Sequence, residues 1–134
     1  MIWGTGIDIC SVARIQPIQE RVATEILTDI ERDQYWCLIP AQQVLFVASR
    51  FAVKEAVAKA LGLGLRAPMT WQSVATQSQD SGRCVIVLYG ELATWVQQRG
   101  LRVHCSISHE QDYAVAVAVV EHDTSGPAYS RDAQ

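Results

Sequence analysis

The segment that most constrains the fold is YAVAVAVVE at residues 113–121. Alanine and valine alternate along it, so a β-strand would carry alanine side chains on one face and valine side chains on the other. Both faces are therefore apolar, and one of them is small. We expect a helix to pack closely over the alanine face. The apolar run is far shorter than the roughly 20 residues of a membrane-spanning helix.

A helix suited to that role is predicted over residues 41–61. Pro40 ends or redirects the preceding helix, and Gly62 and Gly64 supply the expected stop signal. The segment is apolar around most of its circumference, and its core stripe at helical spacing consists of Val53, Val57, Ala60 and Leu61. We expect this long helix to be the central element of the domain.

Shorter elements are expected around it, because periodic apolar segments alternate with turn residues. They are a strand over residues 2–10, a short helix after Ser11, a helix starting at the capping box of Thr28 and Glu31, a hairpin with strands near 71–76 and 84–89, a helix over 91–99 and an antiparallel strand over 101–108. The prediction is a single α+β domain over residues 1–121, with an antiparallel sheet packed on the long helix. The polar residues 122–134 predict a disordered tail.

Charge and composition exclude several functional classes. The net charge of −3 argues against nucleic-acid binding, which normally needs a basic face. The first residues, MIWGTGIDIC, have neither a basic segment nor a long apolar one, so a cytoplasmic protein without a membrane span is expected. Single, scattered cysteines predict buried free thiols, and these are Cys10, Cys37, Cys84 and Cys105.

Positive charge is concentrated between residues 50 and 66 of this acidic chain. The segment contains a single acid, Glu55, and its basic residues are Arg50, Lys54, Lys59 and Arg66. A local excess of this kind suits a phosphate-bearing ligand or an acidic partner.

Glu55 and Lys59 stand one turn apart on the side of the long helix opposite its core stripe. One interpretation is an exposed i, i+4 ion pair that contributes about 0.2–0.5 kcal/mol. The flanking Phe51 and Ala56 instead indicate a half-buried pair. Since burying an ion pair for stability alone is unfavourable, we expect a third charged species, such as a magnesium-bound phosphate.

Asp8 offers a second carboxylate in the first strand. Gly4 and Gly6 of that strand indicate close approach by another backbone or a ligand. Magnesium commonly uses one or two carboxylates together with water and substrate phosphate, so Asp8 and Glu55 would suffice if the strand lies beside the long helix. The alternative for Asp8 is an acid that contacts solvent or a backbone amide.

Ser108 and His109 end the penultimate strand, a common position for ligand-binding groups, although His109 could also be an ordinary loop residue. A serine hydrolase is excluded because no G-x-S-x-G motif exists and the two residues are adjacent. P-loop, dinucleotide-binding and zinc motifs are also missing from the sequence.

Three blocks can be read together: GIDICSVARI at 6–15, RFAVKEAVAKALGLG at 50–64 and SISHEQDYAVAVAVVE at 106–121. In this order and spacing they resemble the holo-[acyl-carrier-protein] synthase family of 4′-phosphopantetheinyl transferases. The resemblance implies the α+β fold of that family and a homotrimer with sites between subunits. It also implies magnesium-dependent transfer of phosphopantetheine from coenzyme A to a serine of an apo acyl carrier protein, in fatty acid or polyketide biosynthesis.

The resemblance also assigns roles to individual residues. The magnesium ligands of the family correspond to Asp8 and Glu55, and its phosphate-binding lysine corresponds to Lys59. Asp8 is the expected general base, with Glu55 as the alternative. The residues implied for coenzyme A binding are Arg50, Lys59, Gly62, Gly64, Ser108 and His109, and those for carrier binding are Arg14 and Arg21.

Two other functions fit the same residues. The first is a non-catalytic trimeric scaffold that binds carrier proteins, and the second is a magnesium-dependent phosphohydrolase. The chain also departs from the family pattern after His109, where Glu110 replaces a common threonine or serine and puts a negative charge near the expected nucleotide phosphates.

Overall fold

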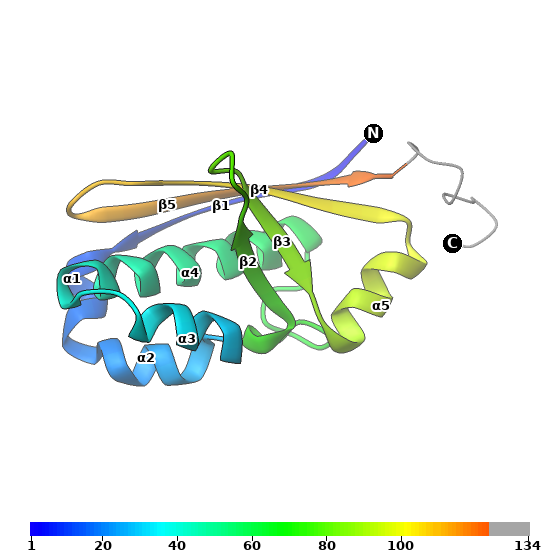
Figure 1. Cartoon of the computed structure of the whole chain (residues 1–134). Helices are drawn as coiled ribbons and strands as arrows, with labels where there is room; N and C mark the ends of the chain where they lie inside the picture. The colour runs from blue at the N-terminus through cyan, green and yellow to red at the C-terminus, as the bar shows by residue number, and fades with distance from the viewer. Residues whose placement is uncertain (124–134) are drawn as a thin grey trace.

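The computed structural model describes residues 1–123 of the chain. A three-stranded antiparallel sheet and a two-stranded hairpin surround one long helix (Figure 1). The strands are β1 (Ile2–Ser11), β2 (Val74–Ser78), β3 (Cys84–Leu88), β4 (Leu101–His109) and β5 (Tyr113–His122). The helices are α1 (Val12–Ile15), α2 (Gln19–Ile26), α3 (Asp29–Trp36), α4 (Pro40–Leu61) and α5 (Gly90–Gln98), with 3₁₀ turns at Gln16–Ile18 and Trp71–Ser73.

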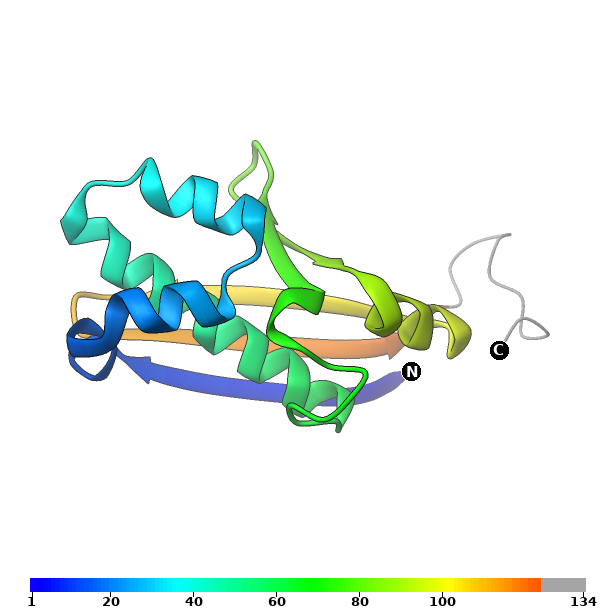
Figure 2. The same cartoon turned by 90° about the horizontal axis from the view of Figure 1, so that it is seen from below.

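The larger sheet has the order β1-β5-β4, and α4 runs along one of its faces (Figure 2). The β2–β3 hairpin forms a separate small sheet on the β4 side, and α2 and α3 lie below α4. This arrangement confirms the predicted α+β domain with an antiparallel sheet on a long central helix. Among the described residues, no helix is long and apolar enough to cross a membrane.

The packing of α4 on the sheet follows from small residues, as predicted. Ala114, Ala116 and Ala118 of β5 are completely buried under the helix. On β1, a Cβ atom added at Gly4 or Gly6 would collide with backbone carbonyls of α4. The glycines therefore serve a close approach between two backbones, and this approach places β1 directly against the long helix.

The opposite face of the sheet carries large apolar side chains. Ile7 is 63% exposed, Ile9 is 60% exposed, and Val117, the partner of Ile7 in the β1–β5 register, is 37% exposed. Among residues 1–123, no helix covers this face (Figure 1). A contiguous apolar surface of this kind is typical of a contact with another protein.

Several predicted boundaries hold and others move. The Thr28–Glu31 capping box is present, and α4 ends at Gly62 in the left-handed conformation. The predicted start of the strand near Trp71 is wrong, because Trp71–Ser73 is a 3₁₀ turn and β2 begins at Val74. Ser11 occupies the N-cap position of α1 without a side-chain cap bond.

Residues 122 and 123, which the sequence analysis placed in a disordered tail, are ordered. His122 belongs to β5 and donates its backbone N–H to the carbonyl of Met1, while Asp123 pairs with Arg102 at 2.9 Å between carboxylate and guanidinium. The remainder of the predicted tail, residues 124–134, lies outside the described residues.

Lys54 has a structural role that the sequence analysis did not assign. Its side chain is fully buried, and its Nζ binds Glu31 Oε1 at 2.7 Å and the carbonyls of Ile26 and Trp71. These contacts satisfy the three donors of the ammonium group. Lys54 therefore joins α4 to α2 and α3, and the expectation that it adds to a ligand-binding cationic segment is wrong.

The prediction of buried, isolated thiols is only partly correct. All four cysteines are free, and Cys10 is buried, but Cys37 is exposed. Cys84 and Cys105 are half-buried and lie with their Sγ atoms 3.3 Å apart. This proximity arises because β3 and β4, distant in sequence, lie side by side in the fold.

Candidate active site

The contact between β1 and α4 brings Asp8, Glu55 and Lys59 together. Asp8 lies on the face of β1 that points toward α4, opposite Ala116 in the sheet register. Lys59 Nζ reaches across the contact, binding Asp8 Oδ1 at 3.2 Å and the carbonyl of Ile7 at 2.9 Å. The Lys59 ion pair therefore connects two elements and is not the simple surface pair with Glu55.

Glu55 is half-buried beside this pair. Its burial, followed by the negative charge of Asp8, raises the pKa of the Glu55 carboxyl above its ordinary value, while the Lys59 charge opposes the shift. Burial and the neighbouring Asp8 charge thus both disfavour the charged form of Glu55, and the Lys59 charge only partly compensates. A cation between the carboxylates would relieve this repulsion.

This carboxylate pair is suited to a hard divalent cation. Within residues 1–123, no group of three or more His, Cys, Asp or Glu side chains forms a complete cage for a metal ion. Magnesium does not need one, because it retains waters and is commonly held by one or two carboxylates plus substrate phosphates. Asp8 and Glu55 therefore fit a magnesium ion that binds together with a phosphate, and Lys59 would contact the phosphate.

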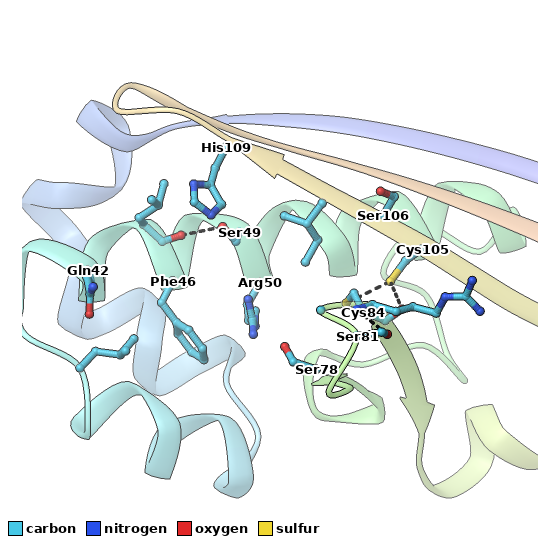
Figure 3. Close-up of a pocket in the computed structure, with 15 residues that line it drawn as sticks. Gln42, Phe46, Ser49, Arg50, Ser78, Ser81, Cys84, Cys105, Ser106 and His109 are labelled. Atoms are coloured by element: carbon cyan, nitrogen blue, oxygen red, sulfur yellow. Dashed lines mark hydrogen bonds between the residues drawn. The ribbon is translucent and has the colours of Figure 1, made fainter.

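A cleft of about 880 Å³ lies on the β4 side of α4. Arg50 and His109 both line it (Figure 3). The Arg50 guanidinium stacks on Phe46, with 4.2 Å between its central carbon and the ring centroid, and its buried Nε has no hydrogen-bond partner among the described residues. Burial lowers the pKa of Arg50, although arginine retains its charge. The cleft therefore holds a partly desolvated cation suited to an anionic ligand.

The lining of this cleft differs in part from the sequence expectation. Ser108 is exposed on β4 and does not line it, nor do Gly62 and Gly64, which end α4 elsewhere. The cleft includes polar residues that the sequence analysis did not select, namely Gln42, Ser81, Arg83 and Ser106. A basic residue next to a glycine at the hairpin tip was the available signal for Ser81-Gly82-Arg83.

The two clusters lie at opposite edges of the larger sheet. Asp8 is on edge strand β1 and His109 is on edge strand β4, with β5 between them. Arg14 and Arg21, the residues expected to contact a carrier, are exposed on α1 and α2, the helices that follow β1 in the chain. One chain therefore presents an acidic cluster with a lysine, a cationic cleft and a pair of exposed arginines as separate surfaces.

A family model described as the 4′-phosphopantetheinyl transferase superfamily matches residues 4–118. This chain belongs to that superfamily. The matched residues include both edges of the sheet and all of α4. The family resemblance of the three sequence blocks is thereby confirmed.

Relatives within the superfamily are similar over nearly the whole chain. The holo-[acyl-carrier-protein] synthase of Cupriavidus taiwanensis is 42% identical, over 98% of this chain and 97% of the relative. The crystal structure of the synthase from Neisseria meningitidis has a TM-score of 0.84 and 32% identity, over 90% of this chain and 99% of that one. The Bacillus anthracis synthase, in complex with coenzyme A (3′,5′-ADP), has a TM-score of 0.81 and 33% identity, over 92% and 99% of the two chains.

Proposed function

We propose that this protein transfers 4′-phosphopantetheine from coenzyme A to a serine of an apo acyl carrier protein and releases 3′,5′-ADP. Its membership of the superfamily and its similarity to holo-[acyl-carrier-protein] synthases support this activity. The single observation that carries the proposal is the meeting of Asp8, Glu55 and Lys59 at the β1–α4 contact, because phosphoryl transfer needs charge neutralisation at the pyrophosphate.

Asp8 and Glu55 would hold a magnesium ion, which when bound supplies positive charge to the pyrophosphate of coenzyme A. Lys59, whose side chain is 53% exposed, can leave Asp8 and bind a phosphate oxygen. Its contact with the Ile7 carbonyl keeps the ammonium group near the same place on β1. Lys59 thus orients the phosphate that is attacked.

The transfer itself forms one phosphorus–oxygen bond and breaks another. The carrier serine hydroxyl attacks the β-phosphorus, and the bond to the leaving 3′,5′-ADP breaks. Asp8 accepts the serine proton in this proposal, because its carboxylate is 17% exposed at the edge strand and so remains accessible to the incoming hydroxyl. Glu55, whose pKa is raised by burial, is the alternative base.

The nucleotide end of coenzyme A is proposed to occupy the cleft at Arg50 and His109. Because this cleft lies on the β4 edge and Asp8 on the β1 edge, we infer that two neighbouring subunits of a homotrimer contribute the two halves of each site. The exposed apolar face of the sheet supports this assembly, since Ile7 and Val117 would be covered by another subunit.

Arg14 and Arg21 would contact an acidic carrier protein. Both are exposed on consecutive helices, and Arg14 lies in the α1 turn that follows the Asp8 strand, so a carrier bound there could reach the transfer site. We propose a cytoplasmic location, which the free cysteines favour because disulfides are rare in that compartment.

Intact-protein mass spectrometry of a carrier tests the activity. The full chain is incubated with coenzyme A, magnesium and an apo carrier from fatty acid synthesis or, separately, from polyketide synthesis. The expected result is a carrier heavier by one phosphopantetheine. A phosphohydrolase would instead release phosphate without any carrier, and a scaffold would bind the carrier without changing its mass. Either of those results would replace the proposed function.

A further inference from the structure

Two cysteines from different sheets face each other in the wall of the cleft. Cys84 is the first residue of β3, and Cys105 lies in the middle of β4. Their Sγ atoms are 3.3 Å apart, both side chains are half-buried, and both line the cleft (Figure 3). The proposed transfer reaction uses neither thiol, so their proximity calls for a separate explanation.

The two thiols have unequal surroundings. Cys105 donates a hydrogen bond to Cys84, and this bond, with help from the Arg50 charge, lowers the pKa of Cys84 to about 7 although burial opposes the shift. The same hydrogen bond and burial raise the pKa of Cys105. The shared hydrogen bond therefore favours ionisation of Cys84 over ionisation of Cys105. A reactive thiolate beside a second thiol is the arrangement of a redox-active pair.

We propose that Cys84 and Cys105 form a reversible dithiol–disulfide site that is oxidised by hydroperoxides. The Cys84 thiolate attacks the O–O bond, becomes a sulfenic acid and releases the alkoxide or hydroxide, which takes a proton from water. The Cys105 thiol then attacks the sulfenic sulfur, the S–S bond forms and water leaves. In sum, two thiols lose two hydrogens and the hydroperoxide is reduced to an alcohol, or water, and a second water. An external thiol reverses the step by exchange.

Oxidation has a mechanical consequence for the cleft. The β2–β3 hairpin and the β1-β5-β4 sheet have separate strand ladders. A disulfide bond between Cys84 and Cys105 would join the hairpin to the sheet covalently. It would also draw the two sulfur atoms together to about 2.05 Å. The hairpin tip at Ser81 and Arg83 forms one wall of the cleft, and β4 forms another. The disulfide therefore fixes one cleft wall to the other.

The experiment uses the full chain carrying Cys37→Ser, since exposed Cys37 could otherwise form disulfides between molecules. After hydrogen peroxide treatment, and before alkylation, we expect an intact mass lower by about 2 Da than that of the reduced chain. After alkylation and digestion we expect a Cys84–Cys105 cross-linked peptide, and dithiothreitol should reverse both changes fully. Absence of that peptide, or oxidation at Cys10 instead, would overturn the proposal. This readout needs neither coenzyme A nor a carrier, so it stands apart from the transfer activity.

Two further measurements test the order of the steps and the fixed wall. Cys105→Ser keeps a hydrogen-bond donor beside Cys84, so oxidation should stop at a sulfenic acid, about 16 Da heavier and trapped by dimedone, whereas Cys84→Ser should give neither product. Trypsin should cleave after exposed Arg83 more slowly in the oxidised chain than in the reduced one. Equal cleavage rates would refute the fixing of the hairpin.

Discussion

Lys59 of α4 binds Asp8 of β1, with 3.2 Å between Nζ and Oδ1, across a contact that joins residues 51 positions apart in the chain. The half-buried Glu55 lies next to this pair, and its pKa is raised by burial and by Asp8. Two acids and one lysine are thus held by a strand and a helix whose backbones touch.

Glu55→Gln should abolish most of the transfer activity while the chain still folds, because the change removes a metal-binding charge and almost no volume. We expect kcat/KM to fall at least about a hundredfold. The measurement is the rate of carrier modification at saturating magnesium. Glu91→Gln, the same change at an exposed position in the first turn of α5, is the matched control and should retain full activity. Equal activities would refute the metal-binding role.

The pH dependence of stability should differ between wild type and Glu55→Gln. An acid with a raised folded-state pKa binds its proton more tightly when folded, so rising pH through that range lowers the free energy of unfolding. Glutamine does not titrate. In the absence of magnesium, the variant should therefore gain stability relative to wild type as the pH rises above the ordinary glutamate range near about pH 4, as measured by urea unfolding. Parallel pH curves for the two proteins would contradict this prediction.

Lys54→Met should destabilise the protein strongly. The change leaves the buried Glu31 carboxylate and two carbonyls without their ammonium partner, and breaking a buried ion pair costs about 3–5 kcal/mol. The same substitution at half-exposed Lys59 should cost less than about 1 kcal/mol but should greatly reduce transfer. Urea unfolding and the carrier assay measure the two effects. A reversed order of stabilities would show that the roles of the two lysines are misassigned.

Val117→Lys should disrupt the proposed homotrimer. The substitution places a charge in the centre of the exposed apolar sheet face, where burial against another subunit would be costly. Light scattering should show a monomer, and transfer activity should fall because each site needs two subunits. Gln97→Lys, at an exposed position of α5, adds the same charge elsewhere and should leave the mass of the assembly unchanged. If the wild-type chain is itself monomeric, the homotrimer proposal fails.

The main elements could be predicted because local patterns and tertiary packing agree. The alanine face of β5 indicates a helix packed closely on the sheet, and the glycines of β1 indicate a second backbone close to that strand. The helix α4 makes both contacts. The placement of Asp8 beside this helix was conditional in the sequence, since Gly4 and Gly6 indicate a close approach on the Asp8 face of β1 without identifying which element makes it. The large isoleucines in fact point outward, which a rule of burying the most apolar face would have reversed.

Other features could not be predicted because they depend on contacts distant in sequence. Lys54 and Lys59 look equivalent in the sequence, yet one is enclosed by α2 and α3 and the other reaches β1. The pairing of Cys84 with Cys105 depends on how the hairpin docks beside β4, which no periodic pattern encodes. The cleft residues at the hairpin tip were missed for the same reason.

The contact of β1 with α4 at Gly4 and Gly6 also bears on how this chain can diverge. Because backbone meets backbone there, the spacing between the Asp8 strand and the Glu55 helix does not depend on the size of any β1 side chain. Core positions outside this contact can accept volume-conserving apolar exchanges at a small cost in stability. The two glycine positions have no such freedom, so variation in this protein should be concentrated away from one short stretch of main chain.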